Sequence, residues 1–140
     1  MRVLGLDVGE ARIGVAVSDS LGLTAQQLTV IPRKGLAADL AALRTLIDAQ
    51  GVGTVVVGLP LTMRGERGIQ AQRIASFGDA LKRQVPVTVT FLDERLTTVQ
   101  GERALLETGA SRRKRKQVID QVAAQLILQQ FLDAKRHPAP

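Results

Sequence analysis

Three acidic positions in this sequence could do chemistry: Asp7, the adjacent pair Asp93–Glu94, and Asp120. Asp7 and the pair end apolar runs typical of strands, and Asp120 lies within a helical pattern near the C-terminus. Carboxylate oxygens are the ligands that Mg²⁺ prefers, and the ion usually takes one or two of them from a protein. Three such acids meeting in space would suit two-metal hydrolysis of a phosphodiester. In that reaction one ion activates water and the other stabilises the leaving oxygen.

Each acidic position also has a purely structural interpretation. Asp7 could shape the turn that follows it. Neighbouring strand residues point to opposite faces, so at most one of Asp93 and Glu94 can face Asp7, and the flanking run does not decide which. Strand ends also carry polar residues simply because they reach solvent. Helix spacing alone favours Asp120 as an exposed acid paired with Lys116, four residues earlier.

Composition narrows the chemistry further. The chain has no cysteine, which excludes disulfides, thiolate metal sites and cysteine nucleophiles. Its one histidine, His137, lies in the C-terminal tail, which argues against histidine-based zinc catalysis and a serine–histidine triad.

The net charge of +6 and the run of five cations at 112–116 favour a polyanionic partner such as nucleic acid. A solvated loop or a targeting-like tract is the alternative interpretation of that run. Aromatic residues make up only 2%, so phosphate contacts are expected to outweigh base stacking on aromatic rings.

The apolar patterns predict one α/β domain over residues 1–140, with a disordered tail at 135–140. Three runs separated by turns predict an antiparallel meander. Helices between later buried strands imply parallel crossovers. The expected strands are 2–8, 12–18, 24–31, 54–58 and 85–92, and the expected helices are 36–50, 69–83, 99–107 and 116–134.

Location and mobility can also be predicted. No run of eighteen apolar residues is present and the N-terminus does not read as a signal peptide, so we expect a cytoplasmic protein with no membrane partner. The segment 60–68 contains glycine and arginine and is expected to be a mobile loop.

Four segments together resemble the YqgF family, also called RuvX. They are LGLDVGEARIGVAVSD (4–19), VVGLPLTMRG (56–65), LDERLTT (92–98) and KQVIDQVAAQLILQQFL (116–132), and they cover nearly the whole chain in the family's order. The resemblance implies a ribonuclease H-like fold similar to the resolvase RuvC, with a mixed five-stranded sheet flanked by helices. It also implies a nuclease using Mg²⁺ or Mn²⁺, acting in resolution of four-way DNA junctions or in maturation of the 5′ end of 16S ribosomal RNA.

When the family's functional residues are matched motif by motif, the resemblance implies that Asp7, Glu94 and Asp120 carry out catalysis and bind metal. It therefore favours Glu94 over Asp93. The sequence departs from the family pattern at Val8, where the family residue is often aromatic. It also departs at Ala11, which follows Glu10 and stands where a basic residue commonly precedes the hairpin arginine. Glu10 could change the electrostatics near Asp7. Basic and hydroxyl residues around these motifs are expected to contact the substrate: Arg12, Arg64, Arg67, Arg95, Thr97, Arg112, Arg113, Arg115 and Lys116.

Three functions compete at this point. A nuclease predicts metal-dependent cleavage that Asp7→Asn abolishes while binding persists. A binding module of nuclease ancestry predicts binding without cleavage. ATP-driven phosphotransfer would need a second domain to enclose the nucleotide, and 140 residues are expected to leave no room for it. A homodimer is a further possibility if a junction is cut symmetrically.

Overall fold

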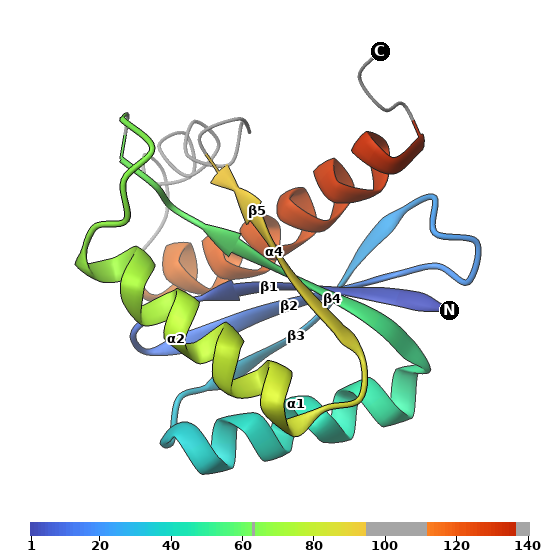
Figure 1. The fold of residues 1–140 in the computed structure, drawn as a ribbon, viewed down its shortest axis with the longest axis horizontal. Coiled ribbons are helices and arrows are strands. Elements are labelled where there is room, and N and C mark those ends of the chain that lie inside the picture. Colours follow the sequence, from blue (N-terminus) through green and yellow to red (C-terminus); the bar gives the residue numbers. More distant parts are fainter. Residues whose placement is uncertain (63, 95–111, 137–140) are drawn as a thin grey trace.

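The computed structural model describes residues 1–62, 64–94 and 112–136, with the backbone alone over 112–120. Five strands and three helices make up these ranges (Figure 1). The elements in chain order are β1 (Arg2–Val8), β2 (Arg12–Ser18), β3 (Ala25–Pro32), α1 (Leu36–Gln50), β4 (Val52–Leu59), α2 (Ile69–Gln84), β5 (Thr88–Asp93) and α4 (Arg112–Arg136).

The five strands form one mixed sheet in the order β3-β2-β1-β4-β5. The β1–β2 and β2–β3 pairs are antiparallel, and the β1–β4 and β4–β5 pairs are parallel. The predicted meander and the predicted parallel crossovers are therefore confirmed. In the β1–β2 turn the Gly9 N–H donates to the Arg12 carbonyl at 2.8 Å, and a Cβ at Gly9 would lie 2.9 Å from that oxygen. Glycine therefore lets this turn close tightly.

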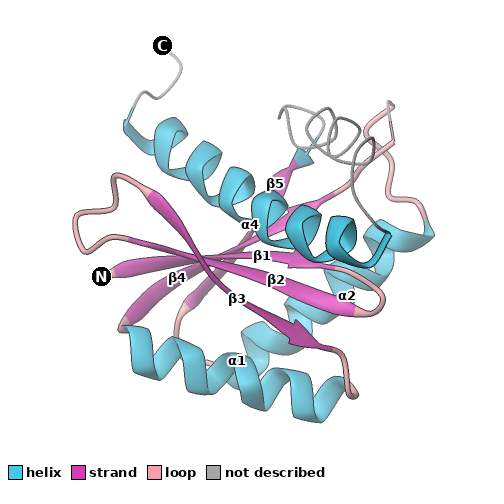
Figure 2. Cartoon of the chain, turned by 180° about the vertical axis from the view of Figure 1, so that it is seen from behind, coloured by secondary structure: helices cyan, strands magenta, loops and turns pink. Residues whose placement is uncertain are grey.

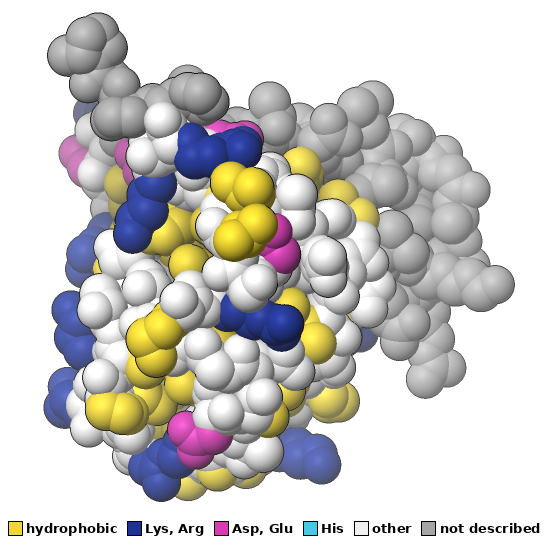
Figure 3. Space-filling model, turned by 90° about the vertical axis from the view of Figure 1, so that its right-hand side faces the viewer, with side chains coloured by type: hydrophobic (Ala, Val, Ile, Leu, Met, Phe, Trp, Pro, Cys, Tyr) yellow, Lys and Arg dark blue, Asp and Glu magenta, His cyan; other side chains and the backbone are white. Residues whose placement is uncertain are grey.

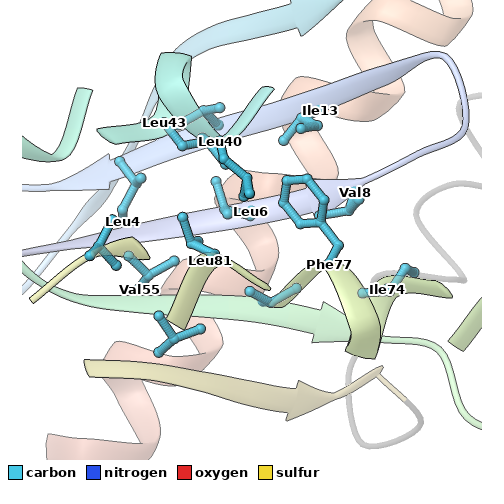
Figure 4. Close-up of a cluster of buried hydrophobic side chains, with 14 of the residues drawn as sticks. Leu4, Leu6, Val8, Ile13, Leu40, Leu43, Val55, Ile74, Phe77 and Leu81 are labelled. Carbon is cyan, nitrogen blue, oxygen red and sulfur yellow. The ribbon is translucent and has the colours of Figure 1, made fainter. Parts of the chain in front are cut away.

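Helices cover both faces of the sheet. α1 and α2 lie on one face and α4 crosses the other, as the two opposite views show (Figures 1 and 2). Successive side chains of β1 point to opposite faces of the sheet, so they enter the two hydrophobic cores in turn. Leu4, Leu6 and Val8 enter the core under α1 and α2 (Figure 4), whereas Val3 enters the core under α4. Asp7 therefore has the parity of the face that α4 covers. No helix in the described ranges is long and apolar enough to cross a membrane.

Small residues let α4 approach the sheet closely. A Cβ at Gly5 would lie 2.7 Å from the Leu128 Cβ and 3.1 Å from the Ala124 carbonyl oxygen, so the helix backbone occupies the space that a side chain would need. Ala16, the partner of Gly5 on β2, is fully buried under the same helix. The position of α4 along the sheet thus depends on the absence of bulk at these positions.

The observed bounds differ from the expected ones at several element ends. β4 spans Val52–Leu59 rather than 54–58, α2 ends at Gln84 rather than at residue 83, and β5 ends at Asp93 rather than at residue 92. β5 begins at Thr88 rather than at residue 85, because Val85 instead ends α2 and donates its N–H to the Leu81 carbonyl. β3 extends one residue further, to Pro32. α4 starts at Arg112, so the basic run at 112–116 belongs to the helix rather than to a loop before it.

At its C-terminal end α4 includes Lys135 and Arg136, which the sequence had assigned to a disordered tail. Arg136 pairs with Asp133 one turn earlier at 2.7 Å, and Lys135 lies 5.0 Å from the centre of the Phe131 ring. Residues 137–140 and the helix expected near 99–107 lie outside the described ranges. The 60–68 loop contains a closed turn, in which Thr62 N–H donates to the Glu66 carbonyl at 2.9 Å.

Candidate active site

Asp7 lies near the carboxyl end of β1, the central strand of the sheet. It is partly buried and is paired in register with Gly14 of β2. On the other side of β1, Leu6 pairs with Val57 of β4, and extending that register by one residue brings Asp7 beside Gly58. Two glycines therefore flank the carboxylate, which leaves room above the sheet on the face that α4 covers.

Glu94, the residue directly after β5, lies at the same end of the sheet. Its side chain is only 2% exposed, and its Oε1 lies 3.0 Å from where a Cβ on Gly58 would be. The same Cβ would meet the Ile127 side chain of α4 at 2.5 Å, so this space lies between β4 and α4. The structure therefore places Asp7 and Glu94 on one face and at one end of the sheet. Gly58 of β4, which has no side chain, leaves the space between them.

Asp93 belongs to the opposite face. It pairs in register with Leu59, whose side chain is buried in the core under α1 and α2. Glu94, by contrast, follows the end of β5, and its carboxylate lies over Gly58 beside Ile127 of α4. The two adjacent acids therefore lie on opposite faces, and of the two Glu94 shares the α4 face with Asp7.

Asp120 lies in the N-terminal half of α4, one helical turn before Ala124, whose backbone contacts Gly5. Figures 1 and 2 both show this half of the helix passing beside the carboxyl end of β1. The N-terminal half of α4, which contains position 120, therefore lies near the end of the sheet where Asp7 lies. The Asp120 side chain is outside the described part of the structure.

The acids that the structure describes here suit a hard cation. Both are carboxylates, the donors that Mg²⁺ and Mn²⁺ favour, and Gly58 leaves the space that Glu94 occupies. Among the described side chains no group of three acidic or histidine residues that could hold a metal is found. A third protein ligand would therefore have to come from outside that set, and Asp120 is the predicted one.

The predicted substrate-contacting residues fall into two groups. Arg12 is half-buried at the start of β2, and Arg64 and Arg67 are exposed on the loop that follows β4. These three lie around the carboxyl ends of β1 and β4. Arg112, Arg113, Arg115 and Lys116 lie in the first turns of α4 with undescribed side chains, and Arg95 and Thr97 lie outside the described ranges.

The opposite end of the sheet looks different. Figure 3 views the molecule from the side where the N-terminus lies, and the Lys and Arg side chains drawn there are dispersed among neutral and apolar ones. The described part of this end therefore shows no gathered basic patch.

A groove beside the β1–β2 turn was not predicted from the sequence. It consists of two cavities of about 530 and 460 Å³, both lined by Arg33 and Arg73, and we call it the arginine groove. Val8 and Gly9, the two residues after Asp7, line the larger cavity. The groove lies on the α1/α2 side, at the same end of the sheet as the acidic pair.

Arg33 organises this groove. Its Nε donates to Asp39 Oδ2 at 2.8 Å, and its Nη1 donates to the Gly9 carbonyl at 2.8 Å. The guanidinium carbon also lies 5.0 Å from the centre of the Phe77 ring. One side chain therefore connects the β1–β2 turn, α1 and α2. The available signal in the sequence was an arginine two residues after the predicted strand 24–31, before a predicted helix with an acid in its first turn.

Asp39 is held ionised in this arrangement. Burial on its own would raise the pKa of Asp39, but hydrogen bonds from the Lys34 N–H and the Arg33 guanidinium outweigh it, and the net pKa lies below its ordinary value. Asp39 is 1% exposed, so the carboxylate is a structural anion that fixes the loop before α1.

The strand order, the C-terminal helix across one face and the acids at the carboxyl end of β1 define a ribonuclease H-like fold of the RuvC type. Thermus thermophilus RuvC bound to a Holliday junction superposes with a TM-score of 0.60 over 99% of this chain and 98% of that one, at 16% identity. The fowlpox virus Holliday junction resolvase gives a TM-score of 0.56 at 10% identity, over 96% of this chain and 99% of that one.

Sequence comparison then identifies the family. The model of the RuvX family, described as "Holliday junction resolvase", matches residues 1–134, and the chain belongs to this family. A relative in Moorella thermoacetica, named "Putative pre-16S rRNA nuclease", is 57% identical over 95% of both chains. A relative of the same name in Myxococcus xanthus is 54% identical over 99% of this chain and 91% of its own.

Proposed function

We propose that this chain is a divalent-metal-dependent endonuclease of structured nucleic acid. The observation that carries the proposal is the placement of Asp7 and Glu94 on one face at one end of the sheet, beneath the helix that contains Asp120. Family membership and the RuvC-type fold support the same reaction class.

In this proposal Asp7, Glu94 and Asp120 hold Mg²⁺ or Mn²⁺. The bound ions would supply the activation of water and the stabilisation of the leaving oxygen, the two functions of a two-metal site. Glu94 is fixed by its burial between β4 and α4, so its oxygens keep one position without solvent reorganisation. Arg64 and Arg67, exposed on the loop after β4, would hold phosphates on either side of the scissile bond.

Precursor 16S ribosomal RNA is the proposed substrate, because the two relatives compared, both more than half identical to this chain, are named for it. Four-way DNA junctions are the second candidate, since the family description and the RuvC structure both refer to them. Symmetric cutting of a junction needs two active sites, so junction activity would require a homodimer. We place the protein in the cytoplasm, where a precursor ribosomal RNA would be available.

The decisive experiment compares the wild type with Asp7→Asn and with Asp48→Asn. Asp48 is an exposed acid near the end of α1, so its variant controls for the loss of one negative charge. Each protein is incubated with a structured precursor RNA, a four-way junction and plain duplex DNA, with Mn²⁺ or with EDTA. We expect Mn²⁺-dependent cleavage by wild type and Asp48→Asn, and a loss of at least about a hundredfold in Asp7→Asn with binding retained.

Metal binding gives a second measurement that does not depend on turnover. Mn²⁺ should raise the melting temperature of wild type and Asp48→Asn, because a ligand that binds only the folded state stabilises it. Asp7→Asn should show a much smaller shift. Cleavage by Asp7→Asn at the wild-type rate would overturn the proposed site. Tight binding without cleavage on every substrate and metal would instead favour a nucleic-acid-binding module.

A further inference from the structure

The arginine groove continues the proposed active site around the β1–β2 turn. Asp7 faces α4, and the next two residues, Val8 and Gly9, line the larger cavity on the opposite side of the sheet. A nucleic acid strand held at Asp7 and leaving over this turn would therefore pass beside the groove. The larger cavity, about 530 Å³, falls within the size range of small-molecule sites.

The groove has a flat cationic surface. One face of the Arg33 guanidinium rests on the buried Phe77 ring, and the Arg33 side chain is 26% exposed while lining both cavities. Its hydrogen bonds to Asp39 and Gly9 hold the guanidinium in place. A fixed guanidinium plane is a surface on which nucleobases stack.

Apolar and neutral side chains also line the groove, beside the charged Glu10, Asp39 and Arg73. Leu36 and Ile69, which are 52% and 72% exposed, line the smaller cavity from α1 and α2. Gln70 lines the larger one and is exposed, so its amide is available to hydrogen-bond a base edge. Exposed apolar side chains beside a stacked arginine suit an uncharged aromatic ring better than a bare anion.

Two opposite charges flank the groove. Arg73 of α2 and Glu10 of the β1–β2 turn approach to 3.5 Å, with side chains 70% and 85% exposed. An ion pair this exposed contributes little stability, so Arg73 can exchange Glu10 for a phosphate at small cost. Glu10 therefore competes with the phosphate for the Arg73 guanidinium.

We propose that the arginine groove binds one unpaired nucleotide of the substrate strand, with its base stacked on Arg33 and its phosphate held by Arg73. The inference rests on the proposed function, because it assumes a nucleic acid partner. It assigns the protein a preference for substrates with unpaired nucleotides beside the cleavage site, and it gives Glu10 a role in weakening that contact.

The test measures binding of a fluorescein-labelled single-stranded RNA and of a fully paired duplex of equal length by anisotropy, in EDTA. Arg73→Gln is compared with Arg83→Gln, which removes the same charge from the exposed last turn of the same helix. We expect Arg73→Gln to weaken single-strand binding about tenfold and to lower the salt slope by about 0.7, with little effect of Arg83→Gln. Glu10→Gln should strengthen binding.

A strand with abasic nucleotides tests the stacking. It should bind the wild type more weakly than the normal strand, and Arg73→Gln should still weaken it. Equal losses in Arg73→Gln and Arg83→Gln would overturn the proposal, as would equal binding of normal and abasic strands. If the protein cleaves its substrate but Arg73→Gln has no selective effect on binding, the nuclease proposal stands and the proposal of a nucleotide site in the groove is wrong. If Arg73→Gln weakens binding selectively but no substrate is cleaved, the nucleotide site stands and the nuclease proposal is wrong.

Discussion

The Glu94 carboxylate lies directly over Gly58: a Cβ added at Gly58 would come within 3.0 Å of Glu94 Oε1. These residues are 36 positions apart in the sequence; Gly58 lies in β4, and Glu94 directly follows the neighbouring parallel strand β5. The absence of a side chain at Gly58 thus creates the space that the Glu94 carboxylate occupies.

Gly58→Ala should therefore displace Glu94. The new methyl group would meet the Ile127 side chain at 2.5 Å and the carboxylate at 3.0 Å, so one or both must move. Because displacement of a catalytic group by about 1 Å can cost on the order of a hundredfold in rate, we expect a loss of that size in nuclease activity.

Gly53→Ala is the matched control, since it makes the same change on the same strand. Its Cβ would meet Met1 Sδ at 2.8 Å, but Met1 is 90% exposed and can move away. We expect normal activity from this variant. If Gly58→Ala also keeps wild-type activity while folded, the position of Glu94 does not matter for cleavage.

Asp39→Asn should lower stability in a pH-dependent way. The unfolded carboxyl has a pKa of about 3.9, and the folded pKa of Asp39 lies below its ordinary value. The stabilisation by the charged form is thus fully present above about pH 4 and is lost as the pH falls through the folded pKa. We expect Asp39→Asn to lower the free energy of unfolding by about 1–3 kcal/mol at pH 7.

Urea denaturation at pH 7 and at successively lower pH measures this difference. Asp48→Asn, an exposed acid on the same helix, should show little change at any pH. A difference between wild type and Asp39→Asn that stays constant down to pH 2 would contradict the assignment of the Arg33–Asp39 contact as the source of the stabilisation.

Gln129→Ala should loosen the attachment of α4 to the edge strand β3. The Gln129 Oε1 accepts the Ala25 N–H at 2.9 Å, and its Nε2 donates to the Leu23 carbonyl at 3.1 Å. Ala25 is 6% exposed, so its N–H would lose its partner in a buried position. We expect a loss of about 1–3 kcal/mol in the free energy of unfolding.

Thermal or urea unfolding measures this loss, with Gln26→Ala as the control because Gln26 is exposed on the same strand. Equal stabilities of the two variants would show that the amide contacts contribute nothing to docking. Since α4 also carries Asp120, we expect Gln129→Ala to lower activity more steeply with temperature than Gln26→Ala does.

Much of the fold could be predicted because its signals are local. Apolar runs at 2–8 and 12–18 specified β1 and β2 to the residue, and leucines at helical spacing specified α1. The bounds failed at Val85, where a β-branched residue ends a helix because its N–H bonds back to Leu81 rather than across a sheet. A local pattern does not distinguish these two partners.

The sequence by itself determined the mixed α/β sheet and the placement of Asp7 at a strand end, because hydrophobic periodicity and turn residues act over a few neighbours. The tertiary structure decided that Glu94 rather than Asp93 shares a face with Asp7, that Gly58 makes room for it, and that Arg33 joins three elements into a groove. These outcomes depend on strand register and on packing between residues far apart in the chain, and such contacts are specified only when the whole fold forms.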